Sequence, residues 1–138
     1  MSVDAAIDSN VLLYAVSRLA EDKSKRERAE ALIGMPFGVS AQILQEFYVN
    51  ATRKIKTPLA PDEARAWVEL LALQPCVPVD VELVRRGIDL SRRYQISYWD
   101  GTILAAAETL GAETLYTEDL NDGQLYGSVR AVNPFRSA

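Results

Sequence analysis

The chain has 138 residues, of which 49% are hydrophobic and 25% are charged, and its formal net charge at pH 7 is −4. This length predicts one globular domain covering residues 1–138. The chain contains a single cysteine and no histidine, which excludes an internal disulfide, a thiolate metal cage and any catalytic mechanism built on imidazole.

The N-terminus has neither the basic segment nor the apolar segment of a signal peptide. The longest apolar runs, such as residues 11–16, are far shorter than a membrane span. We therefore expect a soluble, cytoplasmic protein without membrane association.

Short apolar runs alternate with helical patterns along the chain. We expect, in order, a strand at 3–7, helices at 9–17 and 22–33, a strand at 37–39, helices at 40–54 and 62–73, a strand at 76–79, helices at 80–94 and 97–110, and strands at 114–116 and 129–132. Ser40 and Asp80 are candidate helix N-caps, Pro61 suits a first helical position, and Gly34 and Gly111 suit helix ends. This alternation predicts an α/β fold, a three-layer α/β/α sandwich around a mainly parallel sheet.

Four acidic residues lie at element junctions or on a helix face: Asp8, Glu46, Asp100 and Asp119. In such folds, ligands bind beyond the carboxyl ends of the strands, so acids that follow different strands should meet at one edge. Carboxylates without imidazole or thiol partners are costly to assemble unless a hard divalent cation neutralises them. The pattern therefore indicates a Mg²⁺ or Mn²⁺ site and phosphate chemistry.

Two of these acids also have a structural explanation at a helix start. Asp8 could cap the helix that follows it, although Ser9 and Asn10 add two further polar side chains where one would suffice. Asp100 lies three residues after Ser97, which is the spacing of a capping box.

The other two acids are weaker candidates when taken alone. Glu46 belongs to a polar row with Gln42 and Asn50, spaced four residues apart, which could face water or a polar cleft. Asp119 lies in a turn-rich loop, where Glu118 is a competing acid.

An acidic net charge argues against nucleic acid binding, but the cations are grouped, and one or two groups could line an RNA groove. They lie at 23–28, 53–56, 85–86 and 92–93. The chain has no glycine-rich dinucleotide loop and no Walker A motif. Asn10 stands where a phosphoaspartate phosphatase of the DxD type needs its second aspartate.

Taken together, the four acidic segments resemble the PIN-domain ribonucleases, and specifically the VapC-type toxins of bacterial and archaeal toxin–antitoxin pairs. The resemblance spans nearly the whole chain and rests on the segments AAIDSNVLLYA, SAQILQEFYVN, ISYWDGTILAAA and LYTEDLNDGQ, followed by VNPF. Gly101 departs from the pattern, because a residue with a side chain is expected after the third acid, and we expect it to loosen the first turn of its helix.

The resemblance implies a metal-dependent endoribonuclease that leaves 5′-phosphate and 3′-hydroxyl ends, forms a homodimer and is blocked by an antitoxin. The implied catalytic residues are Asp8, Glu46, Asp100 and Asp119, of which Asp8, Asp100 and Asp119 would bind one or two Mg²⁺ or Mn²⁺ ions. The implied supporting residues are Ser9, Asn10, Ser40 and Glu118. Two alternatives stay open, a catalytically silent PIN-like module that binds RNA or protein, and a Mg²⁺-dependent phosphatase.

Overall fold

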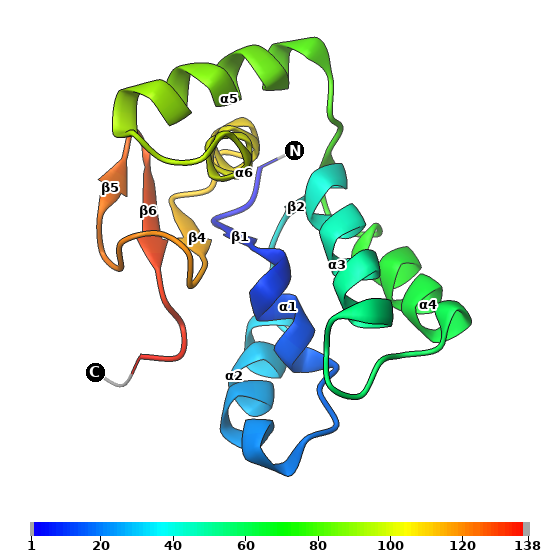
Figure 1. The fold of residues 1–138 in the computed structure, drawn as a ribbon. Helices are drawn as coiled ribbons and strands as arrows, with labels where there is room; N and C mark the ends of the chain where they lie inside the picture. The colour runs from blue at the N-terminus through cyan, green and yellow to red at the C-terminus, as the bar shows by residue number, and fades with distance from the viewer. Residues whose placement is uncertain (1, 137–138) are drawn as a thin grey trace.

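The computed structural model describes residues 2–136, and its elements are drawn in Figure 1. The strands are β1 (Ala5–Ile7), β2 (Val39–Ser40), β3 (Cys76–Val77), β4 (Thr114–Tyr116), β5 (Leu125–Tyr126) and β6 (Val129–Val132). The helices are α1 (Ser9–Ala15), α2 (Lys23–Ile33), α3 (Ala41–Arg53), α4 (Pro61–Leu71), α5 (Val81–Tyr94) and α6 (Tyr98–Thr109), with a 3₁₀ turn η1 (Ala20–Asp22) before α2.

The strands form a mainly parallel sheet. Its larger part has the order β1-β4-β6-β5, and β2 pairs with β3 in a two-stranded part. A parallel bridge between Ala6 and Gly38 joins the two parts next to β1. Among the strand pairs within residues 2–136, only β5–β6 is antiparallel. The carboxyl ends of β1 and β4 therefore lie side by side, with Ile7 paired to Tyr116.

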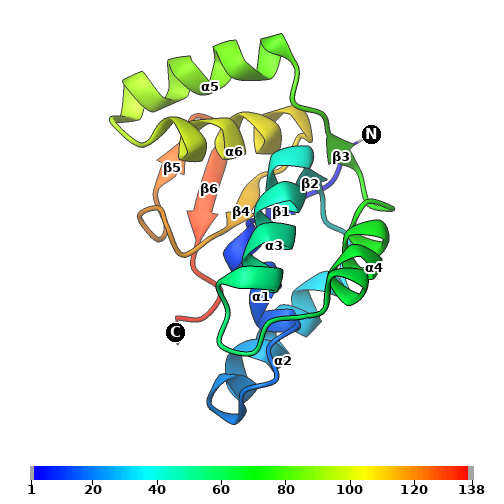
Figure 2. The same cartoon turned by 45° about the vertical axis from the view of Figure 1, so that its right-hand side comes forward.

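The helices cover the two faces of this sheet, which gives the predicted α/β/α sandwich. Figures 1 and 2 show α5 and α6 on one side of the strands and α1 and α2 on the other, with α3 and α4 packed as a pair beside α1 and β2. In α6, every residue from 101 to 107 is buried, because its GTILAAA segment is apolar or small on all sides. None of the helices within residues 2–136 is long and apolar enough to cross a membrane.

The expected elements are confirmed, with ends that differ by a few residues. Ser40 caps α3 by accepting from the Ile43 amide, and Asp80 caps α5 by accepting from the Leu83 amide. Gly111 follows α6 with φ of +73°, a conformation that glycine adopts without strain. Strand β5 was not predicted, because Leu125–Tyr126 is only two residues long and lies in a loop rich in turn-forming residues.

Helices α5 and α6 cross in close contact at two glycines, which corrects the expectation for Gly101. A Cβ on Gly101 would collide with the carbonyl oxygen of Gly87, and would lie 3.1 Å from the Ser91 nitrogen. The first turn of α6 is nevertheless intact, since the Gly101 amide donates to the Ser97 carbonyl at 2.9 Å. The missing side chain therefore permits the helix crossing and does not loosen the helix.

We expect Gly101→Ala to destabilise the protein by about 1–3 kcal/mol, the usual cost of overpacking, although alanine is the better helix former. Gly34→Ala is the matched control, because its added Cβ would meet only ordinary contacts at 3.5 Å. The midpoints of urea unfolding measure both effects. A Gly101→Ala variant as stable as the wild type would contradict the close crossing.

Candidate active site

Asp8 lies at the junction of β1 and α1 and is almost fully buried, with 2% of its surface exposed. Its Oδ1 accepts a hydrogen bond of 2.7 Å from the Ser9 amide, and its Oδ2 accepts one of 2.8 Å from the Thr117 hydroxyl. Thr117 directly follows β4, so the parallel pairing of β1 with β4 places the two residues side by side. Both carboxylate oxygens are therefore held by the backbone or by a buried hydroxyl group.

Burial raises the pKa of Asp8 to about 7 from its ordinary value of 3.8. The Thr117 hydroxyl and the Ser9 amide oppose this shift, while the negative charges of Asp119 and Glu46 add to it. The charged form of the Asp8 carboxyl is therefore destabilised, and a nearby cation would lower the pKa of this group.

Glu46 extends from α3 toward the same edge and is half-buried. Its Oε1 accepts from the Ser9 hydroxyl at 3.1 Å, and its Oε2 accepts from the Gln42 amide group at 3.2 Å. The same Gln42 group donates to the Trp99 carbonyl oxygen at 3.3 Å, which connects α3 to the first turn of α6. The polar row of α3 therefore faces a polar cleft at Gln42 and Glu46.

Asp119 lies in the loop after β4, where the Thr117 hydroxyl accepts from its amide at 3.1 Å. Its carboxylate accepts from the Asn10 side chain at 3.3 and 3.5 Å. The neighbouring Glu118 instead forms an ion pair of 3.7 Å with Lys25. Of the two competing acids, Asp119 is thus the one that contacts the β1–α1 segment.

Asp100 occupies the first turn of α6 and is half-buried. Its amide donates to the Ser97 hydroxyl at 3.0 Å, but within residues 2–136 its carboxylate forms no reciprocal bond to the Ser97 backbone. Burial raises the pKa of Asp100, a hydrogen bond with the Ser97 side chain opposes this shift, and the negative charges of Asp119 and Glu46 add to it. Asp119 and Glu46 therefore act on both Asp8 and Asp100, so the structure brings the four acids into one region.

The sequence model of the PIN-domain family matches residues 5–122, a segment that includes all four acids. The chain belongs to the PIN-domain family. A comparison with curated protein sequences found no match.

The fold of this PIN domain is similar to those of several solved structures. A toxin–antitoxin complex from Klebsiella pneumoniae is 21% identical, with a TM-score of 0.69 over 96% of this chain and 99% of the other. FitAB bound to the IR36 DNA fragment is 19% identical, with a TM-score of 0.68 over 97% of each chain. VapC20 of Mycobacterium tuberculosis, a toxin that cleaves the sarcin–ricin loop, is 16% identical, with a TM-score of 0.65 over 85% and 91%.

Three polar residues of this PIN domain site were missed or left undecided by the sequence. From the sequence, Thr117 was not selected as a site residue. Its position directly after β4, the strand that pairs with β1, is the signal that could have indicated it. Thr102 is buried in α6 and donates to both the Gln42 side chain and the Trp99 carbonyl. For Gln42, the sequence did not decide between a position that faces water and one that faces a polar cleft. Ser40 was expected to support the acids, but its hydroxyl accepts from the Ile43 amide, and within residues 2–136 it forms no hydrogen bond to them.

The donor set of the PIN domain fits a hydrated, hard divalent cation. Among residues 2–136, the ion pairs include none of the four acids. In the same part of the chain, no three acidic or thiol side chains are arranged to hold one ion together. Magnesium keeps several waters and binds through one or two carboxylates, so it does not need three carboxylates that converge on it. The chemistry available to such a site is that of a nuclease hydrolase.

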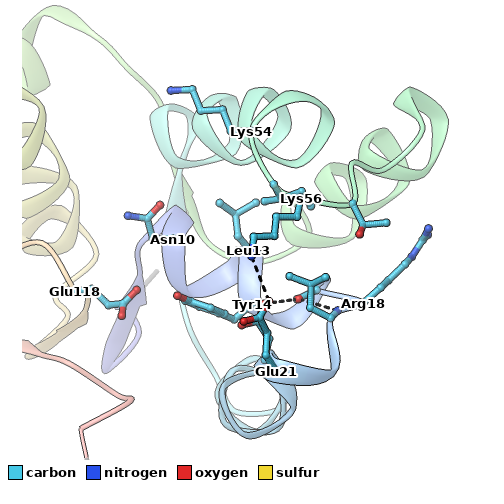
Figure 3. A pocket seen from close by; sticks show the side chains of 13 residues that line it. Asn10, Leu13, Tyr14, Arg18, Glu21, Lys54, Lys56 and Glu118 are labelled. Atoms are coloured by element: carbon cyan, nitrogen blue, oxygen red, sulfur yellow. Dashed lines mark hydrogen bonds and ion pairs between the residues drawn. The ribbon is translucent and has the colours of Figure 1, made fainter.

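A cavity of about 450 Å³ lies beside the acids, between α1, η1 and the segment after α3. Figure 3 shows Asn10 and Glu118 at one side of the cavity, with Lys56 and Arg18 farther along its wall. A second hollow of about 350 Å³ begins at Glu46 and shares Lys54 with the first. Of the four acids, Glu46 lines the second hollow, while the first is lined by Asn10 and Glu118, which are close to Asp8 and Asp119 in the chain.

We expect Asp8→Asn to stabilise the metal-free protein at alkaline pH by roughly 1–4 kcal/mol, from about 1.36 kcal/mol per pKa unit. In the native wild type, Asp8 keeps its proton up to about pH 7, whereas the unfolded chain releases it near 3.8. The native state thus binds more protons between these values, and wild-type stability falls as the pH rises through them. Asparagine carries no charge, so the stability of the variant does not fall with pH for this reason. Urea unfolding in EDTA near pH 5 and near pH 8 measures the difference, and an equal difference at both pH values would count against it.

Proposed function

We propose that this chain is a metal-dependent endoribonuclease that acts in the cytoplasm as the toxin of a toxin–antitoxin pair. The observation that carries this proposal is the group formed by Asp8, Glu46, Asp100 and Asp119, whose charges have no cation partner among residues 2–136. Membership of the PIN-domain family supports the nuclease assignment. Fold similarity to toxin structures, including one named for cleaving the sarcin–ricin loop, supports the toxin assignment.

Asp8, Asp100 and Asp119 would hold Mg²⁺ or Mn²⁺ directly or through water. When bound, the ion would supply charge neutralisation of the phosphodiester and a lowered pKa for the attacking water. Ser9 and Thr117 fix the orientation of the Asp8 carboxylate, and Asn10 fixes that of Asp119. Supporting contacts of this kind hold acidic ligands in place before the substrate arrives.

Glu46 has a different role in this proposal. Its two oxygens are oriented by Ser9 and Gln42, and its side chain is only half-buried, so it stays accessible from the hollow that it lines. Such a carboxylate can accept the proton of the attacking water. Hydrolysis by water needs no 2′-hydroxyl, which fits the 5′-phosphate and 3′-hydroxyl ends expected from the family resemblance.

The adjacent acids Asp119 and Glu118 provide a matched pair of variants. We expect Asp119→Asn to lower Mn²⁺-dependent RNA cleavage by about 10²-fold or more, as for loss of a group that acts in the transition state. Glu118→Gln should change it by less than about threefold, because Glu118 pairs with Lys25 outside the group. Asp8→Asn and Asp100→Asn should abolish cleavage in folded protein.

The assay compares structured RNA with a small phosphomonoester, each with Mn²⁺ and with EDTA. Cleavage of the phosphomonoester alone would favour a phosphatase, and RNA binding without cleavage would favour a silent module. Equal losses in Asp119→Asn and Glu118→Gln would contradict the assignment of Asp119.

The partners in this proposal are an antitoxin and a second copy of the chain. The names of the similar structures describe a toxin–antitoxin complex and FitAB on a DNA fragment, which supports an antitoxin here. An acidic site suits an antitoxin segment that carries arginine, since guanidinium groups pair with carboxylates through two hydrogen bonds. Copurification after expression together with the neighbouring genes tests this, and a lone monomer would contradict both expectations.

A further inference from the structure

Trp99 is the most exposed aromatic residue next to the acids, with 64% of its surface accessible, and it directly precedes Asp100. Its backbone is held in place, because its carbonyl accepts from the Gln42 amide group at 3.3 Å and from the Thr102 hydroxyl at 2.8 Å. The Tyr98 ring contacts the indole edge to face, with centroids 5.1 Å apart. The indole is thus a supported aromatic surface that faces solvent, on the residue directly before Asp100.

The polar row of α3 leads away from Trp99 in steps of one helical turn. Gln42 binds the Trp99 carbonyl, Glu46 accepts from Gln42, and Asn50 lies one turn farther along the hollow that begins at Glu46. Lys54, which follows the last turn of α3, lines this hollow and also the larger cavity beside it. From Gln42 to Lys54 the row spans about 18 Å at 1.5 Å per residue.

Lys54 lies at the end of the polar row that is far from Trp99, and it carries a positive charge there. Within residues 2–136 its ammonium group forms no ion pair, whereas Lys56 pairs with Glu21 and Lys25 pairs with Glu118. Figure 3 shows the Lys54 side chain extending from the end of α3 away from the other residues of the cavity. A cation with no carboxylate partner in a hollow that begins at Glu46 is suited to a phosphate group.

We propose that an unpaired RNA strand lies along the polar row of α3, with one base stacked on Trp99 and a phosphate on Lys54, so that Glu46 and Asp100 meet the backbone between them. An exposed ring accepts only a base that is free of its own stack, so this contact requires an unpaired strand. This inference rests on the proposed nuclease function and assigns two residues outside the acidic group, Trp99 and Lys54, to substrate binding.

Tryptophan fluorescence tests the binding of RNA separately from its cleavage. The chain has two tryptophans, so Trp67→Phe leaves Trp99 as the only reporter. We expect titration with oligouridine, with Ca²⁺ in place of Mn²⁺ and the RNA checked for cleavage on a gel, to quench this fluorescence. A duplex of equal length should quench it much less. Absence of quenching by oligouridine would overturn the proposal.

Variants at the two ends of the path separate stacking from charge. We expect Trp99→Leu to weaken oligouridine binding, measured by anisotropy of labelled RNA, by about 5- to 100-fold, and Trp99→Phe to restore most of it. Lys54→Gln should weaken binding and lower the salt dependence by about 0.7 in log–log slope, the effect of one phosphate contact. Lys23→Gln and Leu73→Ala are exposed controls on other elements and should change neither quantity.

The outcomes distinguish this inference from the proposed nuclease function. If Trp99→Leu and Lys54→Gln cleave RNA with Mn²⁺ and with an unchanged KM, the proposed RNA path along α3 is overturned and the nuclease function stays in place. Specific oligouridine binding without any Mn²⁺-dependent cleavage would support the path and contradict the nuclease. Dissociation of a wild-type dimer by Trp99→Leu, seen by gel filtration, would assign Trp99 to an interface between copies and overturn its role in stacking.

Discussion

The site depends on a carboxylate that the fold buries directly after its first strand. Asp8 is held by the Ser9 amide and the Thr117 hydroxyl, so the end of β1, the start of α1 and the end of β4 converge on one side chain. Two hydrogen bonds do not offset its burial among other acids, and its pKa accordingly rises to about 7. A binding partner that carries positive charge is the most direct way to relieve this cost.

The other acids are held in place by packing that lies behind them. Gln42 connects Glu46 to the first turn of α6, where Thr102 fixes both Gln42 and the Trp99 carbonyl. Helix α6 is itself held close to α5, because Gly87 and Gly101 allow the two backbones to approach. Functional groups on rigid elements keep their geometry better than groups on loops. Three of the four acids meet this condition, because Asp8 caps α1, Glu46 lies within α3 and Asp100 lies in the first turn of α6.

Much of the fold could be predicted from the sequence, because the caps and apolar runs are local signals. Ser40, Asp80 and Gly111 mark element ends where the structure has them. Features that depend on contacts across the chain could not be predicted. Strand β5 exists through its pairing with β6, and the reason for Gly101 is the approach of Gly87 from another helix. At the site, the sequence offered the four acids as candidates. The contact of Thr117 with Asp8 depends on the register of β1 with β4, and the contact of Asp119 with Asn10 spans 109 residues, so neither could be predicted from local patterns.

The most direct test of the central claim is the thermal unfolding of the wild type and of Asp8→Asn near pH 8, each with and without Mn²⁺. If the buried carboxylate requires a cation, saturating Mn²⁺ should raise the Tm of the wild type by roughly 5–10 °C, as for ligand at about a hundred times its Kd. Asp8→Asn should gain little from the ion. An equal rise in both proteins, or no rise in the wild type, would contradict a metal site organised around Asp8.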